Sequence, residues 1–328
     1  MPANLTPEYR DAERSFKEAS NTTEKIDALE HMIAVIPKHK GTEKMQGDLR
    51  RRLAQLKREA EQGRHGSAGR GMAVHRVEKE GAGQVALAGA PNTGKSALLG
   101  RLTHATPEVA NYPFTTRLPV PGMMPFEDIQ IQLVDLPALD PQFGEAWVSQ
   151  VIRGADAVLL VVDLAALDLL DEIENSVALL EKAKVRLGPQ KELPYGYVAK
   201  PTLVVANKVD LPGARENFDA FTELYAGRFP VIAVSAETSA GLEEFKRAVF
   251  EMLGIMRVYT KEPGKKPDLT KPYVLHARAT VAELAGRVHK DILTNLRYAR
   301  VWGHGRFEGQ MVHRDYLLAD RDVVELHT

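Results

Sequence analysis

The segment Gly89-Ala90-Pro91-Asn92-Thr93-Gly94-Lys95-Ser96 fits the pattern G-x-x-x-x-G-K-[ST]. Glycines let the backbone turn sharply, so that successive N–H groups can point at phosphate oxygens. In this pattern Lys95 reaches the outer phosphates and the Ser96 hydroxyl can ligate Mg²⁺. The alternative is a glycine-rich turn that binds nothing, but a strand-like QVALAG precedes the segment and a helical SALLGRL follows it. We therefore predict a phosphate loop, in which residues 89–97, through Ala97, contact the phosphates of a nucleotide.

A second group of residues predicts which base that nucleotide carries. Asn207-Lys208-Val209-Asp210 directly follows the apolar run TLVVA. A carboxylate at Asp210 can accept hydrogen bonds from the ring N–H and the exocyclic amino group of guanine, a donor pair that adenine lacks. We expect Asn207 to brace the neighbouring loops and the stem of Lys208 to lie along the base plane.

A third short segment, Ser235-Ala236-Glu237, follows the next strand-like run, FPVIAV. Its backbone N–H groups are candidates to donate hydrogen bonds to the carbonyl of guanine. Taken alone the triplet says little, because a serine after a strand is often a helix cap.

These residues need a scaffold that brings the ends of several strands together. Between about residues 72 and 254, strand-like apolar runs alternate with helical patterns such as 170–183 and 242–253. This alternation predicts an α/β fold with a mostly parallel sheet covered by helices on both faces. Such sheets bind ligands at the carboxyl ends of their strands.

The two flanking regions differ from this central one. Residues 1–71 show apolar residues at helical spacing in two stretches joined by PKHKG, which predicts a helical hairpin followed by a linker, RHGSAGRG. Residues 255–328 predict a compact α+β module with a strand at 273–277, a helix at 281–291 and short strands near 299–302 and 323–327. The polar stretch KEPGKKPDLTK is predicted to be a solvated linker. The predicted domains are therefore 1–71, 72–254 and 255–328.

The composition excludes several classes of protein. Lys and Arg number 43 and Asp and Glu 44, for a net charge of −1, so a uniformly basic nucleic-acid coat is excluded. The chain has no Cys, which excludes disulfides, Cys-ligated zinc and iron–sulfur clusters. No apolar run approaches the roughly 18 residues of a membrane helix, and the first residues are polar. We predict a soluble, cytoplasmic protein that does not contact a membrane.

Together these motifs resemble those of the Obg/DRG group of translation-factor-related GTPases. GAPNTGKSALLGRLT is similar to the phosphate loop of that group, ANYPFTT (110–116) to its first switch, and LVDLPAL (133–139) stands where its DLPG motif would be. The C-terminal VHKDILTNLRYARVWG is similar to a TGS domain, a β-grasp fold, and KHKGTEKMQGDLRRRLAQLKREA to the N-terminal helical hairpin of DRG proteins. The resemblance implies a Ras-like P-loop G domain. Residues 135–207 leave no room for the large inserted domain of eukaryotic DRG proteins.

The resemblance also assigns residues to the metal and to the switches. Thr116, with Thr115 as the alternative, would ligate Mg²⁺ in the GTP state only, and Asp135 would hold Mg²⁺ through water. Ala138 replaces the glycine of DLPG; its backbone N–H would serve the γ-phosphate, while its Cβ could stiffen the second switch. Leu139 stands where other GTPases have a glutamine that positions water.

Two residues are candidates to replace that glutamine. Asn92 resembles the asparagine that ligates K⁺ in potassium-dependent GTPases, where the cation neutralises developing charge. The alternative is a loop asparagine bonded to its own backbone. Arg117 is either an internal arginine finger or an ordinary surface arginine. The predicted catalytic residues are Lys95, Thr116, Ala138 and Asn92, with Mg²⁺ as cofactor and K⁺ as a second cation.

Basic residues predict where a partner binds. Between Lys38 and Arg70 there are ten Lys or Arg against four Asp or Glu, among them Arg50, Arg51, Arg52, Lys57 and Arg58. They form either an arm that contacts ribosomal RNA or a solvated helix face. The TGS resemblance implies docking to RNA or the ribosome, or a regulatory nucleotide. Its five histidines show no metal-ligand spacing, and His304 is predicted to be a loop residue.

The sequence thus predicts a slow, Mg²⁺-dependent GTPase that acts as a nucleotide switch on the ribosome or in its assembly. It is expected to be a monomer that awaits an unidentified regulatory protein. One alternative is a non-enzymatic RNA- or ribosome-binding protein that uses GTP or GDP as a structural ligand. Another is an Obg-like ATPase, against which the intact Asp210 argues.

Overall fold

The structure is a computed structural model that describes residues 29, 31–36, 49, 51–53, 77–103, 118–139, 146–190, 192–225, 227–303 and 307–328. The chain divides into two compact units, Met1–Arg76 and Val77–Thr328. The boundaries predicted at residues 71/72 and 254/255 remain predictions.

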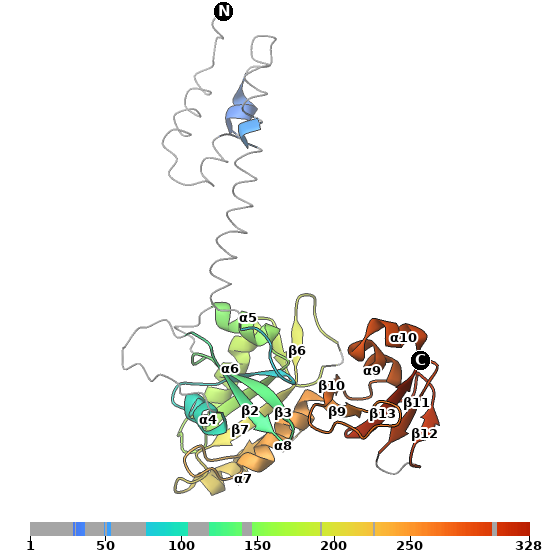
Figure 1. The fold of residues 1–328 in the computed structure, drawn as a ribbon. Helices are drawn as coiled ribbons and strands as arrows, with labels where there is room; N and C mark the ends of the chain where they lie inside the picture. The colour runs from blue at the N-terminus through green and yellow to red at the C-terminus, as the bar shows by residue number, and fades with distance from the viewer. Residues whose placement is uncertain are drawn as a thin grey trace, which may run out of the picture. The chain divides into compact units, whose positions relative to one another are not determined.

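The first part of the larger unit is built on a six-stranded sheet (Figure 1). Its strand order is β2-β3-β1-β4-β7-β8, in which β2 runs antiparallel to β3 and the other neighbours are parallel. The strands are β1 (Gln84–Ala88), β2 (Val120–Phe126), β3 (Ile129–Asp135), β4 (Ala157–Asp163), β7 (Thr202–Asn207) and β8 (Val231–Ala233). A small parallel pair is formed by β5 (Val185–Leu187) and β6 (Val198–Lys200).

Helices cover both faces of this sheet, which confirms the predicted α/β fold. They are α4 (Lys95–Leu102), α5 (Ala146–Gly154), α6 (Leu169–Lys182), α7 (Ala214–Leu224) and α8 (Leu242–Leu253). Side chains of α4 and α8 join one core cluster, and those of α5, α6 and α7 join the other. The central strands are apolar along their interiors because successive residues face opposite layers: Val85 and Leu87 enter one cluster, Ala86 and Ala88 the other.

A second sheet follows directly after α8. Its order is β10-β9-β13-β11-β12, with β9 and β13 parallel and the other pairs antiparallel. Its elements, the orange-to-red part of the ribbon in Figure 1, are β9 (Ile255–Thr260), β10 (Tyr273–His276), α9 (Val281–Val288), α10 (Lys290–Asn295), β11 (Tyr298–Trp302), β12 (Gln310–Val312) and β13 (Asp322–His327). Val281, Leu284 and Ala285 of α9 pack on the strands, so a helix lies across a mixed sheet, as in a β-grasp.

Two details of this module correct the sequence analysis. Strand β9 was not predicted, and it pairs with both β10 and β13. The polar stretch KEPGKKPDLTK, predicted to be a solvated linker, is the mostly exposed loop that connects β9 to β10 within the module. The single predicted helix 281–291 is two helices, because His289 is extended, with φ −166° and ψ 146°. Helix α9 begins at a capping box, in which the Thr280 hydroxyl accepts from the Glu283 N–H and the Glu283 carboxylate accepts from the Thr280 N–H.

The smaller unit is described at only a few positions. Leu29, Met32, Ile36 and Leu49 form a buried apolar cluster, and residues 29, 31–35, 49 and 51–53 are helical. The rest of the predicted helical hairpin, with Arg50, Lys57 and Arg58, lies outside the described residues. Arg51 and Arg52 are exposed.

Across the part of the chain that the structure describes, no helix combines the length and the apolar character needed to span a membrane.

Candidate functional site

The loop between β1 and α4 has the backbone that the glycine pattern predicted. Gly89 and Gly94 have φ angles of 149° and 91°. A Cβ on Gly89 would lie 2.2 Å from the Val161 carbonyl oxygen, and one on Gly94 would lie 2.3 Å from the Asn207 side-chain nitrogen. Both positions therefore require glycine for their conformation and for their close neighbours.

The ammonium group of Lys95 lies inside this loop. It donates to the carbonyl oxygens of Gly89 at 3.1 Å and Ala90 at 2.7 Å, and Lys95 is only 7% exposed. The Thr93 hydroxyl also donates to the Ala90 carbonyl, at 3.1 Å. The cation is thus held at the turn where the loop pattern places phosphate groups.

A hydroxyl and a carboxylate meet at the start of α4. The Ser96 hydroxyl donates to Asp135 Oδ2 at 2.5 Å, although the two residues are 39 positions apart. Strand β3 brings Asp135 there, since it pairs with β1 in parallel and Asp135 is opposite Leu87. Oxygen donors of these two kinds are what Mg²⁺ prefers.

Asn207 joins the phosphate loop to the third predicted segment. Its side-chain N–H donates to the Thr93 carbonyl at 2.9 Å, and its Oδ1 accepts from the Ala236 N–H at 3.1 Å. Asn207 is 1% exposed, at the carboxyl end of β7. It therefore braces both loops, as the sequence led us to expect.

The two residues that complete this motif have different surroundings. Lys208, at a positive φ of 66°, forms an ion pair of 2.6 Å with Asp163. Asp163 ends β4 and is opposite Asn207 in the β4–β7 register. Asp210 is exposed. The sequence analysis missed Asp163, although a carboxylate at the end of an adjacent strand was a usable signal.

The turn after β8 is held by several hydrogen bonds. The Ser235 hydroxyl accepts from the Thr238 N–H at 2.9 Å, and Ser235 is fully buried. Arg101, in the last turn of α4, donates Nε to the Ala236 carbonyl at 3.0 Å and Nη2 to the Glu237 carbonyl. The sequence analysis did not single out Arg101.

The residues after Asp135 explain how the DLPG motif tolerates its substitution. Ala138 does not have the positive φ that would require glycine. The next N–H, of Leu139, donates to the Gly89 carbonyl at 3.0 Å, which ties this segment to the phosphate loop. The Leu139 side chain packs against the core, and a leucine has no polar group with which to order water.

The structure gives a third reason for an asparagine at position 92. Asn92 has φ 61°, a left-handed conformation that asparagine adopts more readily than most residues. Its side chain is exposed and, among the described residues, makes no hydrogen bond to its own backbone. The role of Asn92 in binding K⁺ remains a prediction. Thr115, Thr116, Arg117 and His304 lie outside the described residues.

One carboxylate near the loop is destabilised in its charged form. Burial raises the pKa of Glu172, at the start of α6, and the nearby Asp168 and Asp163 raise it further. The opposing effect of Lys208 and Lys95 is smaller. No cluster of three or more metal-ligating side chains occurs in the described ranges.

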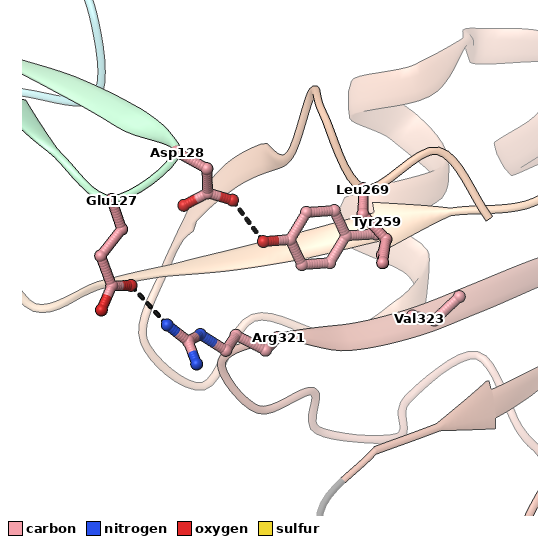
Figure 2. Close-up of a pocket in the computed structure, with 6 residues that line it drawn as sticks. All are labelled: Glu127, Asp128, Tyr259, Leu269, Arg321 and Val323. Atoms are coloured by element: carbon pink, nitrogen blue, oxygen red, sulfur yellow. Dashed lines mark hydrogen bonds and ion pairs between the residues drawn. The ribbon is translucent and has the colours of Figure 1, made fainter.

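A second group of charged residues lies at the other end of β3. The hairpin between β2 and β3 carries Glu127 and Asp128, which line an open pocket of about 480 Å³ together with Tyr259 and Arg321 (Figure 2). Tyr259 donates to Asp128, and Arg321 donates to Glu127 at 2.5 Å. Since Asp135 lies at the opposite end of β3, this pocket is separate from the phosphate loop.

Buried Arg257 is the centre of this second group. It is 3% exposed and donates to Asp320, Asp128 and Glu127. Its guanidinium also stacks 4.9 Å from the Phe250 ring centroid. The group joins the first sheet to the β-grasp module through side chains rather than backbone pairing.

Known proteins match the chain along most of its length. Residues 84–208 match the family model for a 50S ribosome-binding GTPase, and residues 256–328 match the TGS domain. An uncharacterized GTP-binding protein of Methanocaldococcus jannaschii is 30% identical, and the match covers 92% of each protein. Developmentally-regulated G-protein 2 of Arabidopsis thaliana is 27% identical over 92% of this chain and 90% of that protein. The chain belongs to the DRG-like GTPases of the Obg/DRG group.

Two further comparisons describe this DRG-like chain. Ribosome-interacting GTPase 1 of Saccharomyces cerevisiae is 27% identical over 94% of the chain and 99% of the yeast protein. Among solved structures, a GTP-binding protein from Pyrococcus horikoshii has a TM-score of 0.52 at 17% identity, covering 75% of this chain and 99% of that one; it supports the fold alone. The alignment with the archaeal relative spans 364 positions, more than the 328 residues here, so that relative carries segments that this chain lacks.

Proposed function

We propose that this DRG-like protein is a slow, Mg²⁺-dependent GTPase that switches between GTP and GDP states at the ribosome or during its assembly. The observation that carries the proposal is the position of Asn207, whose amide bridges the phosphate loop and the turn at 235–237. A bridge of this kind couples the binding of phosphates to the recognition of the base. The proposed domains are the hairpin 1–71, the G domain 72–254 and the TGS domain 255–328.

The described residues suggest how each part of the nucleotide is held. The backbone of 89–97 offers N–H groups to the phosphates at the positive end of α4. Lys95 would exchange its carbonyl partners for β- and γ-phosphate oxygens and offset their charge. Asp210 is the proposed acceptor for the ring N–H and amino group of guanine. We further propose that the ion pair with Asp163 holds the Lys208 side chain so that its stem lies along the plane of the base.

Ser96 and Asp135 are the proposed holders of Mg²⁺, with Thr116 as a third ligand in the GTP state. Their oxygens already share one hydrogen bond, so both reach the same point beside the loop. A bound Mg²⁺ would neutralise charge that develops on the transferred phosphate. In this arrangement the backbone N–H of Ala138 would bind the γ-phosphate.

Hydrolysis is expected to be slow for the isolated protein. Leu139 is packed against the core and does not position water. We propose that Asn92 helps to hold K⁺ near the phosphates, in place of a glutamine or an arginine finger. Single-turnover hydrolysis is therefore expected to be faster in K⁺ than in Na⁺ at matched ionic strength. Equal rates in the two salts would contradict the role of K⁺ while leaving GTP hydrolysis itself intact.

The proposed partner is the ribosome or ribosomal RNA. We propose that the protein is a cytoplasmic monomer. One relative is named a ribosome-interacting GTPase and the matched G-domain model is named for binding the 50S subunit. We propose that the basic stretch 38–70, including exposed Arg51 and Arg52, contacts RNA phosphates together with the TGS domain.

Co-sedimentation tests this proposal. The full-length protein is mixed with ribosomal subunits in K⁺ buffer at physiological salt, with either GDP or a non-hydrolysable GTP analogue. Preferential pelleting with the GTP analogue is expected for a switch and would identify the subunit. A charge-reversed variant, Arg51→Glu with Arg52→Glu, is expected to pellet less. Equal pelleting in both nucleotide states would contradict the switch.

The alternative function is that of an RNA- or ribosome-binding protein in which GTP or GDP is only a structural ligand. The observation in its favour is Leu139, an apolar residue packed against the core where other GTPases have a glutamine that positions water. Multiple turnovers of GTP in the presence of ribosomes would contradict this alternative. Their absence, with nucleotide-independent pelleting, would favour it.

A further inference from the structure

Arg101 lies outside every nucleotide-binding motif of the chain. It stands in the last turn of α4, six residues after Lys95. Its guanidinium donates to two successive carbonyls, those of Ala236 and Glu237, across 135 and 136 positions of sequence. A guanidinium holds its donors in a rigid fork, so two bonds fix the direction of the groups that accept them.

The bonds from Arg101 determine where one particular N–H points. In a trans peptide the carbonyl oxygen and the following N–H point in opposite directions. When Arg101 holds the Ala236 carbonyl, the Glu237 N–H of the same peptide plane is therefore directed away from Arg101. The orientation of that N–H is set by a residue of a different element.

The neighbouring N–H groups of the turn already have acceptors. The Ala236 N–H donates to Asn207 Oδ1 and the Thr238 N–H to the Ser235 hydroxyl. The Ser239 N–H donates to the Ser235 carbonyl. Within this turn, the Glu237 N–H is the one that has no acceptor among the described residues. It is the donor left for a ligand atom on the side of the turn that faces away from Arg101.

We propose that Arg101 is a positioning residue for base selection: it aims the Glu237 N–H at the 6-oxo group of guanine. This inference rests on the proposed binding of guanine by Asn207, Asp210 and the turn. A purine with an amino group at position 6 presents a donor to the same N–H and is rejected. Arg101 also links the two ends of the site, because its helix begins at the phosphate loop.

A simpler role for Arg101 is to place positive charge at the carboxyl end of α4, which stabilises a helix without any effect on the base. Substitution by lysine separates the two roles. Arg101→Lys keeps the charge but lacks the fork that binds two carbonyls. Arg153 supplies a matched control, because its guanidinium also binds backbone carbonyls, those of Lys184 at 2.9 Å and Gly196 at 3.0 Å, away from the phosphate loop.

The test compares the affinity of the full-length protein for GDP and for 6-thio-GDP, which differ only in the atom at position 6. Sulfur accepts hydrogen bonds weakly, so the contribution of the aimed N–H is reduced in the thio ligand. Arg101→Ala and Arg101→Lys are both expected to bind GDP about tenfold more weakly, and 6-thio-GDP only about twofold more weakly. Arg153→Ala is expected to change neither affinity.

Three results would overturn the inference. They are an equal loss of affinity for both ligands, no loss in Arg101→Ala, or full GDP affinity in Arg101→Lys. The affinity of the wild-type protein for ADP distinguishes a failure of the role of Arg101 from a failure of the proposed function. A wild-type protein that binds ADP as well as GDP would refute guanine recognition itself and the role of Arg101 with it.

Discussion

At the scale of single residues, the proposed guanine site depends on groups whose partners are already fixed. The Asn207 side chain is buried and makes two hydrogen bonds, and Lys208 forms an ion pair with Asp163. Asp210, in contrast, is exposed, and its side chain makes no hydrogen bond or ion pair with the described residues. Its substitution should therefore change ligand recognition and leave folding intact.

Asp210→Asn is expected to weaken GDP binding by about 100-fold and to improve binding of XDP. Xanthine has a carbonyl where guanine has its amino group, so that carbonyl accepts from the Asn amide N–H, whereas a carboxylate oxygen would repel it. Fluorescent nucleotide titration measures both affinities, with Asp219→Asn, an exposed residue of α7, as the control. Unchanged GDP affinity in Asp210→Asn would mean that another group reads the base.

At the scale of elements, the phosphate loop is fixed by what lies behind it. Gly94 precedes α4 with φ 91°, and a Cβ there would overlap the Asn207 side-chain nitrogen at 2.3 Å. Gly213 precedes α7 with a similar φ of 77°, but a Cβ there would meet nothing within 4 Å. Comparing alanine substitutions at Gly94 and Gly213 therefore separates the cost of backbone strain from the cost of steric overlap.

Gly94→Ala is expected to lower the free energy of unfolding by about 2 kcal/mol or more and to weaken GDP binding, since Asn207 is displaced from both loops. Gly213→Ala is expected to lower it by about 1 kcal/mol, from backbone strain alone. Urea unfolding measures the free energy of unfolding of each variant, and nucleotide titration measures its affinity for GDP. Similar losses in both variants would show that the contact with Asn207 is unimportant.

At the scale of the whole molecule, Arg257 holds the β2–β3 hairpin to the β-grasp module. The hydrogen bonds that Arg257 donates to the Asp320 carboxylate raise the pKa of Arg257 above its ordinary value. Hydrogen bonds from Arg257 and Arg321 lower the pKa of Glu127. Burial alone would raise the pKa of Asp320, but the hydrogen bonds it accepts from Arg257, together with the positive charges of Arg257 and Arg321, outweigh burial and lower it. Three carboxylates thus depend on one buried cation.

Arg257→Ala is expected to lower the free energy of unfolding by about 3–5 kcal/mol at pH 7, because it leaves those carboxylates without the cation. Arg321→Ala, whose side chain is 53% exposed, is the control and is expected to lower it by less than about 1 kcal/mol. Urea unfolding at pH 7 checks both values. Equal effects would contradict a central role for Arg257.

The same network predicts a dependence on pH. Carboxyls with lowered folded pKa values stabilise the protein fully above their unfolded pKa values, which are 4.5 for Glu127 and 3.8 for Asp320. That stability is lost as the pH falls through the lower folded values. Wild type is therefore expected to lose stability steeply below about pH 4.5, and Arg257→Ala less steeply. Parallel pH profiles of the two proteins would argue against this network.

Much of this protein was predictable from local patterns. The loop at 89–96, the NKVD motif at the end of a strand, the alternation of strands and helices, and the bounds of α8 are each encoded within a few consecutive residues. The switch threonine and the basic hairpin are also sequence predictions, but they lie outside the described residues. Local patterns suffice here because phosphate binding and strand burial depend on the order of neighbouring residues.

Other features were decided only by the tertiary structure. Strand β9 follows a helix after a single glycine and was missed, and its pairing with β10 and β13 places the polar stretch inside the module. Arg101 contacts Glu237 across 136 positions, Lys208 contacts Asp163 across 45, and Arg257 contacts Glu127 across 130. The periodicity of a sequence indicates which face of its element a residue lies on. The partner that the residue contacts depends on which strands pair and on the paths of the loops between them, and both are decided only when the chain folds.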